Sequence, residues 1–243
     1  MKCINYAHRG FSGKYPENTM LAFEKAIEAG CEGIELDVHL TKDGEMVIIH
    51  DEEIDRTSSK TGWIKDMTYE ELSKIDFSYH FDVPFQKMPT LQEYFELVKD
   101  LNIITNIELK TGVYDYPGIE EKVYNLICEF HLQKKVVISS FNHFSVMRMK
   151  QLDETLICGF LTECWMIGAA EYVEKYQIEG YHPYFSSLSK KEMKEFKNRG
   201  ISINTWTVNE INDIGYMIDL EVEGIISNYP DRVRDCLKER GLR

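Results

Sequence analysis

The sequence predicts a (β/α)8 barrel, the TIM-barrel class of α/β fold, with a small insertion after the second strand. Short apolar runs alternate with amphipathic helical stretches, which is the order of a parallel α/β protein. Eight such runs are present, and 243 residues is close to the usual size of this barrel. No linker or low-complexity tract interrupts residues 1–243, so a single domain is expected. An open doubly wound sheet is the alternative.

The expected strands are short and rich in apolar and β-branched residues, as suits strands covered on both faces. They are Ile4–Ala7, Gly33–Val38, Ile103–Leu109, Val136–Ser139, Leu156–Leu161, Gly180–His182, Ser202–Trp206 and Gly224–Ser227. The sixth is the least certain in extent, because it is very short and Pro183 follows it directly.

Start and stop residues indicate the helices between these strands. The first helix, about Thr19–Ala29, has Asn18 as its expected N-cap and Gly30 at the position of a left-handed C-terminal cap. Capping boxes (Thr or Ser followed three residues later by Glu) begin at Thr68, Thr90 and Ser189. The remaining signals are Pro117 in a first turn, N-caps at Asn142 and Asn209, and a stop at Gly200.

The segment between Asp51 and Pro89 departs from this alternation. It is rich in turn residues and contains a short helix near Thr68–Ile75, but no strong barrel strand. We therefore expect residues 51–89 to form an insertion over the mouth of the barrel, where such folds carry their functional loops.

Composition limits the partners of the chain. Its 41 acidic residues outnumber 28 basic ones, for a formal net charge of −13, which argues against a nucleic-acid partner. No apolar run approaches the length of a membrane span or a signal peptide, so we expect a cytoplasmic protein without stable membrane association. The six cysteines show no metal-type spacing and are expected to be reduced core residues. A small-molecule substrate fits these limits.

Three carboxylates fall at the carboxyl ends of neighbouring strands, where barrel active sites lie. Glu35 and Asp37 are two residues apart on the second strand and therefore share a face, and Glu108 ends the third strand. Their oxygens would repel one another unless they bound a cation, and an all-oxygen set favours Mg²⁺ or Ca²⁺. The alternative is that some of these acids are surface or salt-bridged residues.

Two histidines are expected at the same place. His8 ends the first strand. Asp43-Gly44 indicates a two-residue hairpin turn, and counting back from it pairs Asp37 with His50. Two imidazoles suit general acid–base catalysis near neutral pH. The other five histidines are expected to be structural or solvated: His39, His80, His131, His143 and His182.

Further polar and aromatic residues complete the expected site. Arg9 and Lys110 would supply positive charge for phosphate oxygens. Phe141 and Trp206 end the fourth and seventh strands and either line the substrate pocket or belong to the core. Glu17 and Asn18 could also face the site, although Asn18 is expected to cap a helix.

The ordered set of motifs in this chain is specific. It comprises His8-Arg9-Gly10, Pro16-Glu17-Asn18-Thr19, Glu35-Leu36-Asp37-Val38, Thr41-Lys42-Asp43-Gly44, His50-Asp51, Asp55-Arg56-Thr57, Pro89-Thr90-Leu91, Asn106-Ile107-Glu108-Leu109-Lys110, Ser140-Phe141, Trp206-Thr207-Val208-Asn209 and Gly224-Ile225-Ile226-Ser227-Asn228-Tyr229-Pro230. In these motifs the chain resembles the bacterial, cytosolic glycerophosphodiester phosphodiesterases nearly from end to end.

The resemblance implies hydrolysis of a glycerophosphodiester to sn-glycerol 3-phosphate and an alcohol. It implies one divalent cation, Mg²⁺ or Ca²⁺, on Glu35, Asp37 and Glu108. It also implies His8 and His50 as the acid–base pair, and phosphate contacts from Arg9 and Lys110. We expect His8 to be the acid and His50 the base, a division that the sequence alone does not fix. The attacking group is either water or a hydroxyl of the substrate's glycerol, as in the related phosphatidylinositol phospholipases.

Two other functions fit the same residues. One is a lysophospholipase D- or C-like phosphodiesterase, for which the aromatic residues of the insertion would form an apolar surface: Trp63, Phe77, Tyr79, Phe81 and Phe85. The other is a non-catalytic barrel that senses a phosphorylated metabolite. The full set of two histidines, three acids and two cationic side chains favours catalysis.

Overall fold

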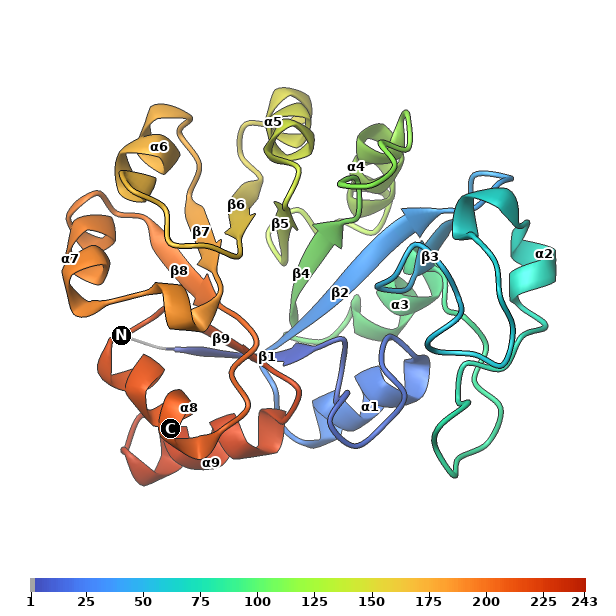
Figure 1. Cartoon of the computed structure of the whole chain (residues 1–243), viewed down its shortest axis with the longest axis horizontal. Helices are drawn as coiled ribbons and strands as arrows, with labels where there is room; N and C mark the ends of the chain where they lie inside the picture. Colours follow the sequence, from blue (N-terminus) through green and yellow to red (C-terminus); the bar gives the residue numbers. More distant parts are fainter. Residues whose placement is uncertain (1–2) are drawn as a thin grey trace.

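The computed structural model describes residues 3–243 and forms a closed barrel of eight parallel strands surrounded by helices (Figure 1). The first two residues of the expected domain lie outside this range. Around the barrel the strands follow the order β1, β9, β8, β7, β6, β5, β4 and β2, and pairing of β1 with β2 closes it. The expected fold class is confirmed.

All eight expected barrel strands are present, with ends that differ from the predicted ones by one residue or less at most positions. They are β1 (Ile4–His8), β2 (Gly33–Leu40), β4 (Ile104–Leu109), β5 (Val136–Ser140), β6 (Ile157–Thr162), β7 (Gly180–Pro183), β8 (Ser202–Thr205) and β9 (Gly224–Ser227). Strand β7 includes Pro183 and pairs with both β6 and β8. The additional strand β3 (Met46–Ile48) runs antiparallel to the end of β2.

The helices cover the outside of the barrel (Figure 1). They are α1 (Met20–Glu28), α2 (Tyr69–Leu72), α3 (Leu91–Val98), α4 (Ile119–Glu129), α5 (His143–Leu152), α6 (Ala169–Lys175), α7 (Lys190–Asn198), α8 (Ile211–Asp219) and α9 (Pro230–Glu239), with short 3-10 turns η1 (Ile64–Asp66) and η2 (Phe185–Ser187). Capping boxes at Thr68, Thr90 and Ser189 open α2, α3 and α7 as predicted.

Three expected helix starts are wrong. Helix α1 is capped by Thr19, whose hydroxyl accepts from the Ala22 amide, and not by Asn18. Helix α8 begins after Glu210, because the Asn209 side chain instead accepts a hydrogen bond from the Asn228 amide. Pro117 precedes the N-cap of α4 and does not lie in its first turn. In the first two cases the polar side chain binds another part of the chain.

The hairpin after β2 differs from the predicted register by one residue. Gly44 has a φ of +83° and ends a three-residue loop, in which its amide donates to the Thr41 carbonyl. Asp43 and Gly44 thus form the end of a wider loop, and Leu40 pairs with Met46. Asp37 consequently lies opposite Ile49, whose amide donates to the Asp37 carbonyl, and His50 follows just beyond.

The insertion has a small hydrophobic cluster of its own, apart from the main core. Its buried members are Val47, Ile49, Ile54, Ile64, Leu72, Phe77 and Met88. The first two come from β3 and the residue after it, so the insertion packs on the hairpin that leads away from β2. In Figure 1 this segment, with α2, lies to one side of the barrel strands.

The main core fills the space between the strands and the helices and extends from Cys3 to Leu237. Cys3, Cys31, Cys158 and Cys236 are buried thiols, as expected, whereas Cys164 is exposed, so the core expectation fails for that residue. Within residues 3–243, none of the helices combines the length and apolar character that a membrane crossing requires.

Candidate active site

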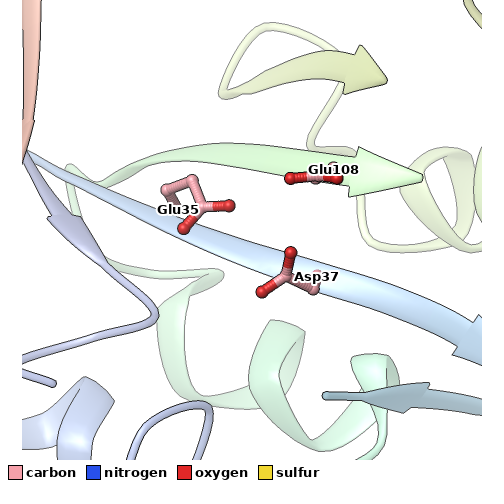
Figure 2. Close-up of side chains that lie close together, drawn as sticks. All are labelled: Glu35, Asp37 and Glu108. Atoms are coloured by element: carbon pink, nitrogen blue, oxygen red, sulfur yellow. The ribbon is translucent and has the colours of Figure 1, made fainter. Parts of the chain in front are cut away.

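Three carboxylates meet at one end of the barrel. Glu35 and Asp37 extend from β2 and Glu108 from β4, and Figure 2 shows the three carboxyl groups turned toward one another. Asp37 and Glu108 are direct neighbours in the parallel register of these strands. One oxygen from each residue lies within 4.8 Å of the others. The intervening Leu36 and Leu109 point to the opposite face and enter the main core.

These acids are almost entirely removed from water, with exposed fractions of 4%, 0% and 8% for Glu35, Asp37 and Glu108. Burial and the neighbouring carboxylates raise the pKa of Glu35 well above its usual value. Burial likewise raises the pKa of Glu108, against the lowering effect of Lys110. For Asp37, the opposing charge of Arg9 and other neighbours outweighs burial and holds its pKa well below the usual range. The two glutamates are therefore harder to ionise than free carboxyl groups, whereas Asp37 stays ionised.

The donor set fits a hard divalent cation. Three converging carboxylates offer only oxygen ligands, which Mg²⁺ and Ca²⁺ prefer. The Oδ1 atom of Asp37 is buried and has no hydrogen-bond partner among the described residues. A buried anionic oxygen without a donor is costly, and a bound cation would satisfy it. Residues 35, 37 and 108 could therefore hold such an ion.

Arg9 and Lys110 lie on two sides of the acidic cluster. The Nε atom of Arg9 lies 3.5 Å from Asp37 Oδ2, and the backbone amide of Arg9 donates to Glu35 Oε2 at 3.1 Å. Lys110 Nζ donates to Glu108 Oε1 at 2.9 Å. Burial would lower the pKa of each cationic group, but the surrounding carboxylates raise it, so both stay charged. They place positive charge beside the acidic cluster in a protein whose net charge is −13.

His8 is held at the end of β1 by an amide from the other end of the chain. Its Nδ1 lies 2.6 Å from Oδ1 of Asn228, which can only accept, so Nδ1 carries the proton. Its Nε2 atom faces the acidic cluster, 3.9 Å from Glu35 Oε2. Burial, assisted by the charge of Arg9, lowers the pKa of His8 to about 3. His8 is therefore neutral at neutral pH.

His50 is oriented by its neighbour in the sequence. Its Nδ1 lies 2.6 Å from the Asp51 carboxylate, and its Nε2 lies 3.2 Å from Lys110 Nζ. The buried His39 donates from Nε2 to the backbone carbonyl of His50 at 3.1 Å, and its Nδ1 meets the Tyr116 hydroxyl. His39 thus has the structural role expected of it, and it fixes the backbone that presents His50.

Phe141 and Trp206 lie together at the carboxyl ends of β5 and β8. Their rings meet edge to face with centroids 5.5 Å apart. Phe141 is 41% exposed and Trp206 is partly exposed, so neither belongs to the closed core. The Trp206 indole donates to the His182 carbonyl at 2.9 Å, which fixes the ring. The pair can form an apolar wall beside the polar site.

Glu17 and Asn18 do face the site. Asn18 has a φ of +55° and donates to Asp37 Oδ2 at 2.9 Å, in place of the capping role expected for it, and Glu17 accepts from Arg9 at 2.9 Å. Three further residues of the site, Asn228, Asp51 and Arg56, lie in motifs of the sequence but were assigned no role there. Their contacts follow only from the fold, which brings Asn228 to His8.

The fold and these side chains define a class of α/β barrels with three converging carboxylates, two histidines and two cationic side chains at one end of the strands. Residues 8–232 match the glycerophosphoryl diester phosphodiesterase family, and the chain belongs to it. A glycerophosphodiester phosphodiesterase of Caldanaerobacter subterraneus subsp. tengcongensis is 40% identical over 99% of this chain and 100% of its own length.

Solved structures agree with this membership. A glycerophosphodiester phosphodiesterase of Thermotoga maritima superimposes with a TM-score of 0.79 at 30% identity, over 97% of this chain and 98% of the other. A phosphodiesterase of Oleispira antarctica, solved in complex with the product sn-glycerol-3-phosphate, superimposes with a TM-score of 0.83 at 26% identity, over 96% of each chain.

Proposed function

We propose that this protein hydrolyses glycerophosphodiesters to sn-glycerol 3-phosphate and an alcohol, and that the chain acts as a single catalytic domain. The convergence of Glu35, Asp37 and Glu108 within 4.8 Å beside Arg9 and Lys110 carries the proposal. The Oleispira antarctica relative binds the product that this reaction would release. Because the family membership covers residues 8–232, the same chemistry is the best-supported function for this site.

We infer that Glu35, Asp37 and Glu108 hold one divalent cation, Mg²⁺ or Ca²⁺. When bound, such an ion neutralises phosphate charge and polarises an oxygen ligand. We propose that Arg9 and Lys110, which lie against Asp37 and Glu108, contact the phosphate oxygens and stabilise the charge that grows on them during the reaction. Asn18 holds Asp37 by its Oδ2 atom and leaves Oδ1 for the ion.

His8 and His50 are proposed as the acid–base pair. Both donate from Nδ1, to Asn228 and Asp51 respectively, and both direct Nε2 into the site, where Nε2 of His50 meets Lys110 Nζ. Lys110 Nζ can only donate, so His50 Nε2, 3.2 Å away, is the acceptor in this contact, and such a nitrogen suits removal of a proton from the attacking water or glycerol hydroxyl. The Asp51 carboxylate orients the His50 ring and stabilises the positive charge that forms on it when it takes up this proton. His8 would serve the departing alcohol, and the division expected from the sequence, with His8 as the acid and His50 as the base, stays a prediction.

Phe141 and Trp206 are proposed to form the wall against which the glycerol carbons lie. Their edge-to-face contact leaves ring surface accessible, and Trp206 is fixed through the His182 carbonyl. Apolar contact with the carbon skeleton, together with ionic contacts to phosphate, is the usual division of labour in a small-molecule site.

One observation favours a second candidate, a phosphodiesterase that acts on lysolipids. The insertion exposes large aromatic side chains, among them Tyr79 at 53% and Phe85 at 54%, and its Phe81 lines a hollow together with Glu17 and Arg56. Such side chains could contact an acyl chain, since exposed apolar surface beside a site often marks a binding region.

Substrate choice separates these functions. We expect release of sn-glycerol 3-phosphate from glycerophosphocholine and glycerophosphoethanolamine, at a higher kcat/KM than for any product of long-chain lysophosphatidylcholine. Preference for the lysolipid would favour the second candidate. Tight binding of sn-glycerol 3-phosphate by folded protein, with no turnover of either substrate class, would indicate a sensor and contradict both.

A further inference from the structure

We propose that Arg56, supplied by the insertion, is a positioning residue that holds both sides of the active site through two carboxylates, Asp51 and Glu17. The inference rests on the proposed phosphodiesterase function and adds a specific task for the insertion. It begins from a guanidinium group that engages two acidic side chains at once, from parts of the chain 39 and five residues away.

Every nitrogen of the Arg56 guanidinium is used. Toward Asp51, Nε lies 2.7 Å from Oδ2 and Nη2 lies 3.2 Å from Oδ1. Toward Glu17, Nη1 lies 2.7 Å from Oε2 and Nη2 lies 2.7 Å from Oε1. Each carboxylate therefore accepts two parallel N–H groups. This geometry fixes the orientation of the carboxylate as well as its distance from Arg56, and lysine cannot reproduce it.

Each carboxylate in turn holds a residue of the proposed machinery. Asp51 accepts from Nδ1 of His50 at 2.6 Å. Glu17 Oε1 accepts from Nη1 of Arg9 at 2.9 Å, and Arg9 lies against Asp37. Arg56 is therefore the common origin of two chains of contacts, one that ends on a proposed proton-transfer group and one that ends on a proposed phosphate contact.

The backbone that presents Arg56 is anchored. Ile54, two residues earlier, is completely buried in the cluster of the insertion. Ser58, two residues later, is also buried, and its hydroxyl donates to the Ile54 carbonyl at 2.9 Å. The guanidinium thus extends from a fixed turn toward the site.

The exposure of Arg56 indicates that its contacts affect catalysis more than the stability of the fold. Its side chain is 49% exposed, and ion pairs at such positions contribute little to the free energy of unfolding. Small displacements of catalytic groups, by contrast, cost large factors in rate. Loss of Arg56 would free the carboxyl groups of Asp51 and Glu17 to rotate, so kcat should fall far more than stability.

The test uses the full chain, glycerophosphocholine and saturating cation. We expect Arg56→Gln to lower kcat about ten- to a hundredfold, with a smaller change in KM. The control is Arg199→Gln, because Arg199 also bridges two carboxylates, those of Glu171 and Glu174, but at the end of α7. Both variants should have closely similar unfolding midpoints, and the control should retain wild-type kcat.

Double-variant cycles give a measurement that a merely structural role would not affect. Arg56→Gln combined with Asp51→Asn, and separately with Glu17→Gln, should lower kcat by less than the product of the single losses, because each pair acts along one chain of contacts. Arg56→Lys keeps the positive charge but not the paired N–H donors to each carboxylate, and its kcat should lie between those of Arg56→Gln and the wild type.

Three outcomes would overturn the proposal. The first is a kcat for Arg56→Gln within about twofold of the wild type. The second is a loss of kcat in either double variant that equals the product of the two single losses. The third is full wild-type kcat for Arg56→Lys. Failure of the wild-type protein to turn over any glycerophosphodiester is a different result, because it would remove the proposed function itself.

Discussion

At the scale of single residues, the two imidazoles are oriented by partners of different charge. His8 donates to a neutral amide, that of Asn228, and His50 donates to the carboxylate of Asp51. In both cases Nδ1 is occupied and Nε2 faces the site, where Nε2 of His50 also meets Lys110 Nζ. The Asn228 amide fixes the tautomer of His8, whereas the Asp51 carboxylate can in addition stabilise positive charge that forms on His50 during proton transfer.

The Asn228 contact predicts the effect of removing it. In Asn228→Ala, Nδ1 of His8 loses its acceptor and the ring can adopt the other tautomer or rotate. We expect kcat to fall about ten- to a hundredfold, while the protein stays folded. Steady-state kinetics and thermal unfolding measure the two effects. Unchanged kcat in this variant would show that His8 needs no such orientation.

At the scale of elements, the start of α1 divides two tasks between adjacent residues. Thr19 caps the helix, and Asn18, in a left-handed conformation, turns its amide to Asp37. Sequence preference alone ranks both as good N-caps. The hairpin after β2 poses the same problem, since Asp43-Gly44 fits either a two-residue turn or the end of a three-residue loop.

Variants at these neighbours should separate stability from cation binding. Thr19→Ala removes the cap and should cost about 1 kcal/mol of stability with normal cation affinity. Asn18→Gly removes the donor to Asp37 without adding strain at this left-handed position, and it should raise the cation concentration for half-maximal activity about tenfold or more. Thermal unfolding and activity titrations distinguish the two. Equal cation requirements in all variants would rule out this role for Asn18.

Sequence reasoning succeeded where a local rule decides the structure. The strand–helix alternation, the capping boxes and the two-residue spacing of Glu35 and Asp37 are such rules, and the structure has all of them. It failed where long-range contacts decide. Asn228 reaches His8 only because β9 lies beside β1, and Arg56 reaches Glu17 only because the insertion folds back over the first loop.

At the scale of the whole molecule, the barrel brings three acids into a space with little water. Strand β2, which carries Glu35 and Asp37, is held between β1 and β4. The raised pKa of Glu35 reflects the free-energy cost of burying these carboxylates together. Arg9 and Lys110 offset part of the negative charge, but a cation would offset more. The fold is therefore expected to be more stable with the ion than without it.

This cost predicts a pH dependence. Without cation, folded Glu35 keeps a proton that the unfolded chain loses above about pH 4.3, so unfolding becomes easier as the pH rises through the window up to the raised pKa. Asp37, with its lowered pKa, affects stability only at lower pH. The rise in unfolding temperature on adding Mg²⁺ or Ca²⁺ should therefore be larger at pH 8 than at pH 5. Glu35→Gln should weaken this difference, and an equal rise at both pH values would contradict the explanation.

The central claim is that Glu35, Asp37 and Glu108 hold a cation on which phosphodiester hydrolysis depends. The most direct test measures sn-glycerol 3-phosphate release from glycerophosphocholine by chelator-treated protein, before and after Mg²⁺ or Ca²⁺ is restored. We predict no product from the stripped protein, recovery with one of the two ions, and little recovery in Glu108→Gln. Full activity in the stripped protein, or undiminished recovery in Glu108→Gln, would contradict the claim.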